Sequence, residues 1–266
     1  MARSCSISSD GAEALRLGRE LPAAPGLVRL DVCWNSVGAG AESLLSGATR
    51  LETLDLGTNV LDRSGVAALS RGLARTPSLT SLRLSDVELG GGGAQLLAAS
   101  LSRIKISKLS LNRPRADLLG PDGAKQLCTI VGQLPALTGL VVNHQRLGPE
   151  GVGALAAELG RATPRLELLF LTSNEAGDAG AEAVAAALTG LPRLRTLDMG
   201  DNGIGDAGAT RLADAVLRSS RLETLYLSGN PFTAAGAERL AAAQTATGRP
   251  DYLSLGYAPR PAAAER

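Results

Sequence analysis

The sequence predicts an α/β solenoid: one curved domain over residues 1–266, with about nine parallel strands on its concave face and helices on its convex face. Three observations predict this fold. The chain repeats itself about every 28 residues, each copy holds leucines that alternate as in a short strand, and each copy continues into an apolar segment of helical period. One strand and one helix cannot bury their apolar faces alone, so the copies are expected to stack.

Eight copies share the frame L-x-x-L-x-L-x-x-N-x-L-x-x-x-G, whose first leucine is position 1. They start at Leu27, Leu51, Leu79, Ile106, Leu137, Leu166, Leu194 and Leu222. Side chains alternate along a strand, so positions 4 and 6, such as Leu54 and Leu56, are predicted to point into the core, and positions 3, 5 and 7 to face the concave surface. The segment after the glycine, such as GVAALSRGLA from Gly65, is the expected helix.

The two ends of the chain depart from this frame. Residues 7–20 look like the second half of a copy, so the chain is expected to begin on a helix with no strand before it. A terminal strand is predicted over residues 251–257, followed by a tail, residues 258–266, in which Pro259 and Pro261 would blunt the sheet edge. Both ends would serve as caps. The alternatives are a chain cut from a longer protein, or copies of the chain that stack end to end.

Three consecutive copies, over residues 79–165, lack the asparagine at position 9. The other five copies carry it as Asn35, Asn59, Asn174, Asn202 and Asn230, whereas these three carry Val87, Pro114 and Gln145. Its loss is expected to loosen those turns or to give their buried amides other partners. Repeat decay is the favoured interpretation, and a bend or loop that shapes a site is the alternative.

The repeats resemble the leucine-rich repeat family, in its ribonuclease-inhibitor-like class, over nearly the whole chain. The resemblance implies a horseshoe-shaped scaffold that grips a protein with its concave surface, and position-9 asparagines that hydrogen-bond the turns as a ladder. It identifies no partner. A family of GTPase-activating proteins shares this long repeat, so that activity is an alternative, with Arg113 or Arg115 as the candidate arginine. A further alternative is an accessory or structural segment of a larger protein.

Composition narrows the function classes. A net charge of +1, from 27 basic and 26 acidic residues, provides no global field to attract nucleic acid or an anionic membrane. The three cysteines, Cys5, Cys33 and Cys128, lack C-x-x-C spacing, so neither a disulfide framework nor a zinc site is expected. No segment reads as a signal peptide or a membrane span, which predicts a cytoplasmic protein, with export by another route as the alternative. No cofactor, metal or small-molecule substrate is expected.

One copy contains a literal G-x-G-x-x-G at Gly203, Gly205 and Gly208, and Glu223 lies twenty residues beyond the first glycine, as in a dinucleotide-binding fingerprint. The repeat frame explains the match differently. Gly208 is the position-15 glycine that recurs as Gly65 in another copy, and Glu223 is position 2 of the next copy. The motif is therefore predicted to be the turn of one repeat and not a phosphate loop.

Two groups of residues could in principle form a catalytic arrangement. Asp31 and Asp55 occupy position 5 of adjacent copies, about 4.8 Å apart by strand spacing, but no apolar pocket is evident to raise one pKa, so a solvated acidic patch is predicted. His144 is the only histidine. Strand spacing puts Cys33 about 19 Å from it, which excludes a dyad, and no acid is evident to orient its ring toward Ser110. The protein is predicted not to be an enzyme.

The concave surface is the predicted binding site. Five of the six aromatic residues map to it or to its rim, where large rings resemble the anchors of protein interfaces. Its charges form bands, basic around Arg83 and Lys108 and acidic on either side, which would set the register of a protein partner. The predicted contact residues are Trp34, Arg83, Phe170, Asp198 and Tyr226. Phe170→Ala and Tyr226→Ala are expected to weaken binding while barely changing stability.

Overall fold

The structure is a computed structural model that describes residues 3–6, 26–35, 37–59, 61–84, 90–112, 123–219, 221–248 and 253–254. Several predictions fall wholly or partly outside these residues: the helix over 7–20, Val87, Arg113, Pro114, Arg115, the terminal strand over 251–257 apart from 253–254, and the tail over 258–266.

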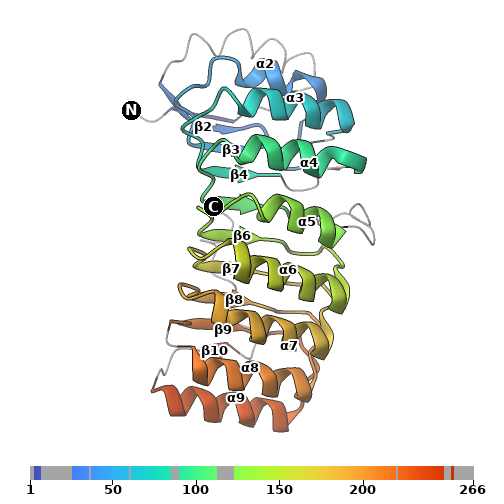
Figure 1. The fold of residues 1–266 in the computed structure, drawn as a ribbon, viewed down its shortest axis with the longest axis vertical. Helices are drawn as coiled ribbons and strands as arrows, with labels where there is room; N and C mark the ends of the chain where they lie inside the picture. The colour runs from blue at the N-terminus through green and yellow to red at the C-terminus, as the bar shows by residue number, and fades with distance from the viewer. Residues whose placement is uncertain are drawn as a thin grey trace.

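Ten strands of the described chain form one parallel sheet, in which each strand pairs with the next one along the chain (Figure 1). They are β1 (Arg3–Ser6), β2 (Leu27–Asp31), β3 (Thr53–Asp55), β4 (Ser81–Arg83), β5 (Lys108–Ser110), β6 (Gly139–Val141), β7 (Leu168–Phe170), β8 (Thr196–Asp198), β9 (Thr224–Tyr226) and β10 (Leu253–Ser254). Equal positions of neighbouring copies pair, as Leu54 does with Leu82 and Asp55 with Arg83. The predicted α/β solenoid is confirmed, with ten strands in place of about nine.

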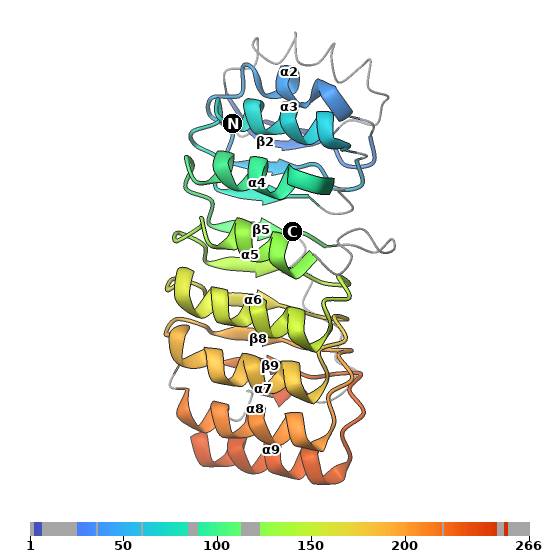
Figure 2. The same cartoon turned by 45° about the vertical axis from the view of Figure 1, so that its right-hand side comes forward.

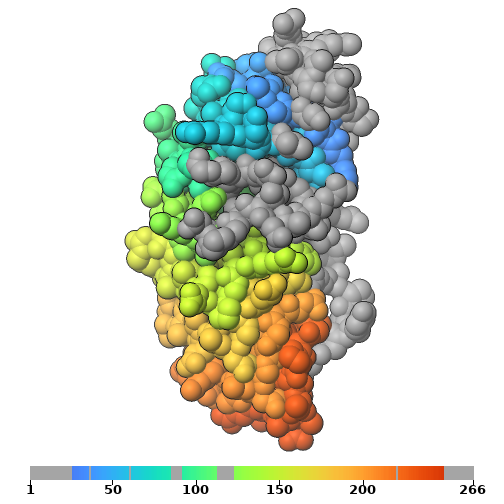
Figure 3. Space-filling model, turned by 90° about the vertical axis from the view of Figure 1, so that its right-hand side faces the viewer, coloured from blue at the N-terminus to red at the C-terminus, as the bar shows by residue number. Residues whose placement is uncertain are grey.

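Helices connect successive strands and lie together on one side of the sheet (Figures 1 and 2). They are η2 (Gly38–Gly40), α2 (Ala41–Leu45), α3 (Arg63–Leu73), α4 (Gly90–Leu101), α5 (Gly123–Val131), α6 (Gly148–Ala162), α7 (Gly177–Ala187), η4 (Leu188–Gly190), α8 (Asp206–Arg218) and α9 (Ala234–Thr247). Each long helix packs against the next, α6 on α7 and α8 on α9 among them. The chain colours therefore succeed one another along the molecule (Figure 3), as expected when each repeat contacts only its neighbours.

The core is a continuous aliphatic layer between the sheet and the helices. Positions 4 and 6 are fully buried, as Leu54, Leu56, Leu197 and Met199 show. On the helical side, α8 buries Leu212 and Val216 against the same layer. The strand alternation predicted from the sequence is thus confirmed, and it fixes which side chains remain for the opposite face of the sheet.

Strand β1 was not predicted. The chain was expected to begin on a helix with no strand before it, but β1 pairs with β2, placing Cys5 beside Leu30 and Ser6 beside Asp31. The segment RSCS carries none of the leucines that define the frame, so the repeat pattern gave no signal for it.

The position-9 asparagines form the expected ladder. Nδ2 of Asn59 donates to the carbonyl of Val32 in the preceding copy at 2.8 Å and to that of Leu56 in its own copy at 2.9 Å. Its Oδ1 accepts from the backbone N–H of Val37 at 3.1 Å. Equivalent bonds to two copies are made by Asn174, Asn202 and Asn230. Each of these amides joins one turn to the turn before it.

Gln145 replaces the ladder asparagine in the copy that starts at Leu137. Its longer side chain still donates through Nε2 to the carbonyl of Leu111 in the preceding copy, and its backbone N–H donates to Oδ1 of Asn174 at 3.1 Å. Asn143 adds a second link, since its Oδ1 accepts from the N–H of Thr172 at 2.9 Å. Of the two expected consequences of losing the asparagine, the structure shows other partners at this copy.

Candidate binding surface

The face of the sheet opposite the helices carries no helix within the described residues (Figures 1 and 2). We call this face the concave surface, and it is formed by the side chains at positions 3, 5 and 7. Parallel sheets usually have both faces covered, because helical connections pack on each side. Here all described helices lie on one side, so the side chains of the other face are available for another role.

The five predicted contact residues differ in accessibility. Trp34 is 67% exposed, and Arg83 and Tyr226 are half-buried. Phe170 and Asp198 are only 7% and 1% exposed, so the expectation that they are open contact residues is wrong. Phe170 lies between Val141 and Asp198 in the sheet register. Phe170→Ala is therefore expected to affect stability as well.

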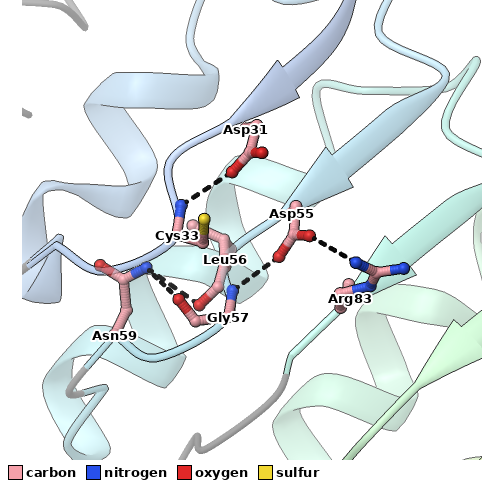
Figure 4. A network of polar contacts seen from close by, with 7 residues as sticks. All are labelled: Asp31, Cys33, Asp55, Leu56, Gly57, Asn59 and Arg83. Carbon is pink, nitrogen blue, oxygen red and sulfur yellow. Dashed lines mark hydrogen bonds and ion pairs between the residues drawn. The ribbon is translucent and has the colours of Figure 1, made fainter. Parts of the chain in front are cut away.

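Aspartates at position 5 bind the backbone of their own copy. Oδ1 of Asp31 accepts from the N–H of Cys33 at 3.0 Å, and Oδ1 of Asp55 accepts from that of Gly57 at 2.8 Å (Figure 4). Asp198 repeats the pattern with Gly200, also at 2.8 Å. Such local bonds are typical of aspartate at turns. This role was not predicted, although an Asp two residues before the turn in three copies was the available signal.

Asp55 is held on both carboxylate oxygens. While Oδ1 accepts from Gly57, Oδ2 lies 3.1 Å from Nη1 of Arg83 on β4 (Figure 4). The pKa of Asp55 is raised overall, chiefly by burial. The Gly57 N–H and Arg83 lower it, and the charge of Asp31 raises it further. The expected solvated acidic patch is thus a half-buried network. Because its oxygens are engaged by these partners, Asp55 is placed to hold the turn and Arg83.

The thiol of Cys33 is kept protonated. Burial, a hydrogen bond to Asp31 and the charges of Asp31 and Asp55 raise its pKa to about 11. Only the thiolate is a nucleophile, so this cysteine is unreactive at neutral pH. Together with the four strand steps between Cys33 on the β2 side and His144 beyond β6, this argues against a Cys–His arrangement.

Position 8 forms the rim of the concave surface in an unusual backbone conformation. Five residues there other than glycine have φ values of 53 to 61°, in the left-handed region that such residues rarely adopt, and they are Trp34, Thr58, His144, Ser173 and Asp201. Gly229 occupies the same position with φ 75°. The backbone N–H of His144 donates to the carbonyl of Thr172 at 2.9 Å, and its side chain is exposed. The predicted rim position of His144 is confirmed, and its role in binding stays a prediction.

The G-x-G-x-x-G segment is occupied by a carboxylate of this chain. Oδ1 of Asp178, in the preceding copy, accepts from the N–H groups of Gly205 at 2.7 Å and Gly208 at 2.9 Å. The start of α8 would otherwise be the place for a phosphate, because its N–H groups point outward. Its amides are already bound, so the segment is a repeat turn, as predicted.

The next helix start is held in the same way by Asp206. Its Oδ1 accepts from the N–H groups of Thr233 at 2.8 Å and Gly236 at 3.0 Å, and its Oδ2 accepts from the hydroxyl of Thr233 at 2.8 Å. The hydroxyl first, and then these N–H groups, lower the pKa of Asp206. We call the contacts made by Asp178 and Asp206 the carboxylate links.

Asp206→Asn should reduce the loss of stability that the protein undergoes when the pH falls from 5.5 to 3. The folded-state pKa of Asp206 lies below the unfolded value of about 3.9, so its contribution is complete above that pH and is lost as the pH falls through the folded pKa. Asparagine keeps the acceptor oxygen but does not titrate in this range. Melting temperatures at pH 5.5 and pH 3 should therefore differ less in the variant than in the wild type, and equal differences would contradict the link.

Two kinds of feature are absent from the described part of the chain. It contains no group of three or more His, Cys, Asp or Glu residues that could hold a metal ion. None of its helices is long and apolar enough to cross a membrane.

Comparison with known proteins identifies the repeat. A family model described as leucine rich repeat matches residues 191–213 and 219–241, which fall in the two copies joined through Asp206. The chain is a leucine-rich repeat protein. It is 31% identical over 162 residues to a ribonuclease inhibitor of Sus scrofa, an alignment that covers 58% of this chain and 35% of the inhibitor. It is 30% identical over 167 residues to NACHT, LRR and PYD domains-containing protein 5 of Mus musculus, covering 60% of this chain and 14% of that protein.

Solved structures show the same solenoid. A protein from Bacteroides fragilis superposes with a TM-score of 0.60 at 18% identity, covering 96% of this leucine-rich repeat protein and 74% of the other chain. The leucine-rich repeat-containing protein LegL7 from Legionella pneumophila has a TM-score of 0.57 at 17% identity, covering 93% and 91%. At these identities the likeness shows the fold alone. The chain spans about a third or less of the two relatives matched by sequence.

Proposed function

We propose that this leucine-rich repeat protein is a non-enzymatic module that binds a protein partner through its concave surface. The observation that supports the proposal is the sheet face without a helical layer in the described chain. Such a face offers side chains from many neighbouring strands at once, which suits an extended partner better than a small substrate. A half-buried tyrosine on β9 and an exposed tryptophan at the rim add the large rings that anchor protein interfaces.

The similarity to a ribonuclease inhibitor also supports a protein as the partner. A ribonuclease inhibitor acts, by its name, on another protein, and its similarity to this chain extends over 58% of the chain. We propose Trp34, Arg83 and Tyr226 as contact residues. Phe170 and Asp198, being buried, would instead shape the surface around them. The alternative of a GTPase-activating protein depends on Arg113 and Arg115, outside the described residues, so it has no support from the described surface.

Affinity capture from a lysate of the source cell tests the proposal. A Trp34→Ala/Tyr226→Ala double variant should lose at least about tenfold of the captured partner, because truncating aromatic anchor residues commonly costs this much binding. Leu217→Ala is the matched control, since Leu217 is a large apolar residue, 46% exposed, on helix α8 of the opposite face. It should capture as the wild type does. The same captured set with all three baits, each shown by melting to be folded, would contradict binding by the concave surface.

A further inference from the structure

A hollow of about 70 Å³, partly open to solvent, lies on the concave surface across strands β4 to β7. It exists because Gly139, at position 3 of β6, has no side chain to fill it. A Cβ atom built there would lie 3.7 Å from Cγ of Lys108 and 3.9 Å from Cδ1 of Leu168, which are ordinary contact distances. This is room for several water-sized atoms, enough for the end of one apolar side chain, and it is below the about 300 to 1,000 Å³ of sites that enclose a whole ligand.

The lining of this hollow is apolar on one side and basic on the other. Val141, Leu168 and Phe170 come from β6 and β7, whereas Arg83 and Lys108 come from β4 and β5. No acidic residue is among the described residues that line it. Position 3 and position 5 side chains share this face, so the cations and the apolar groups are presented to the same occupant.

The two cations are not equivalent. The guanidinium of Arg83 is paired with Asp55 at 3.1 Å. The side chain of Lys108 is exposed, and its ammonium group makes no hydrogen bond or ion pair with any residue that the structure describes. An ammonium beside an apolar hollow favours a ligand that brings a negative charge next to an apolar group, because the charge then pairs while the apolar group leaves water.

We propose that the hollow receives an acidic segment of the protein partner, in which an aspartate or glutamate stands beside a bulky apolar residue. The carboxylate pairs with Lys108, and the apolar side chain enters over Gly139 between Leu168 and Phe170. This assignment rests on the proposed function and specifies the chemistry of the partner. A nucleic acid fits less well, because one unpaired cation does not track a phosphate backbone and Phe170 is too buried to stack on a base.

Two substitutions test the site separately, one by filling its apolar hollow and one by reversing the charge of its lysine. Gly139→Leu fills the hollow, and its backbone needs no positive φ, so a side chain is accepted and suits a strand better than glycine does. Lys108→Glu reverses the charge of an exposed residue. Their controls lie at position 3 of strands outside the hollow: Thr224→Leu on β9 matches the first, and Arg29→Glu on β2 matches the second.

The experiment selects a random twelve-residue peptide display library on the folded wild-type chain and measures the dissociation constants of the enriched peptides by fluorescence polarisation. Enriched sequences should carry Asp or Glu within two residues of Leu, Ile, Phe or Trp. Gly139→Leu should weaken their binding by about 30-fold or more, and Lys108→Glu by about tenfold or more, the latter less at high salt. Thr224→Leu and Arg29→Glu should change it by less than about twofold.

Enrichment of basic or purely apolar peptides, no enrichment at all, or equal binding to the wild type and to both hollow variants would overturn the proposal. The same four variants used as capture baits separate it from the proposed function. If the hollow variants keep the partner that Trp34→Ala/Tyr226→Ala loses, the concave surface binds a protein without using the hollow. If only the hollow variants lose the partner, the hollow is its binding site, and the proposal that Trp34 and Tyr226 contact the partner is wrong.

Discussion

Asn202→Ala should lower the free energy of unfolding by about 3 kcal/mol. The side chain is 1% exposed, and its Nδ2 donates to the carbonyls of Leu171 and Gly200, both at 2.9 Å. Its Oδ1 accepts from the backbone N–H groups of Asn174 at 3.0 Å and Ala176 at 3.3 Å. Alanine leaves these two buried N–H groups without an acceptor, at a cost of about 1 kcal/mol or more each. It also takes one of two donors from each carbonyl, since Leu171 keeps Nδ2 of Asn174 and Gly200 keeps the N–H of Ser173.

Urea unfolding followed by circular dichroism measures this loss. Arg211→Ala is the control, because Arg211 lies in the same copy with its side chain 58% exposed and is 3.4 Å from Glu182, which is also exposed. Exposed pairs of this kind contribute about 0 to 1 kcal/mol. An Asn202→Ala loss no larger than that of the control would mean that water replaces the ladder bonds without cost.

Gly208→Ala should destabilise the protein by about 2 kcal/mol, even though alanine is the better helix former by about 1 kcal/mol. A Cβ at this position would lie 2.6 Å from Oδ1 of Asp178 and 2.7 Å from Cγ2 of Ile204. Relief requires Asp178 to move, and its Oδ1 then loses the N–H groups of Gly205 and Gly208. The helix start is thereby left without its acceptor.

Gly203→Ala provides the comparison within the same G-x-G-x-x-G motif. Gly203 has φ 69° and no atom within 4 Å of its built Cβ, so its cost is the left-handed backbone alone, about 1 kcal/mol. Urea unfolding should therefore rank Gly208→Ala as the more destabilising change. The reverse order would show that the turn conformation, and not the close approach of two copies, makes glycine necessary in this motif.

The periodicity of the sequence predicted the fold because its signal is local and repeated. Leucines at positions 4 and 6 had to face the core in every copy, and Leu54 and Leu197 are fully buried as expected. The repeat frame also predicted correctly that the G-x-G-x-x-G is a turn. Asp178, which holds this turn, and Asp206, which holds the next helix start, could not be predicted in these roles, since each acts on the copy that follows its own.

Accessibility on the concave surface was harder to predict than position. Phe170 and Asp198 lie on the predicted strands, yet both are buried, because the exposure of a strand residue depends on the side chains of its neighbours. The alternation of side chains along a strand predicts which face of the sheet a residue occupies, but it does not predict how much of that side chain is exposed to solvent. Gly139 shows the converse, since a residue with no side chain creates the hollow that no list of binding residue types would include.

The carboxylate links give the solenoid unequal interfaces between its repeats. Asp178 ties the copy starting at Leu166 to the one starting at Leu194, and Asp206 ties that copy to the one starting at Leu222. Asp62, by contrast, caps the helix of its own copy, accepting from Gly65 at 2.8 Å. In a linear array, stability is shared only between neighbours. The three linked copies are therefore expected to open together, and opening of the array is expected to begin in copies outside them.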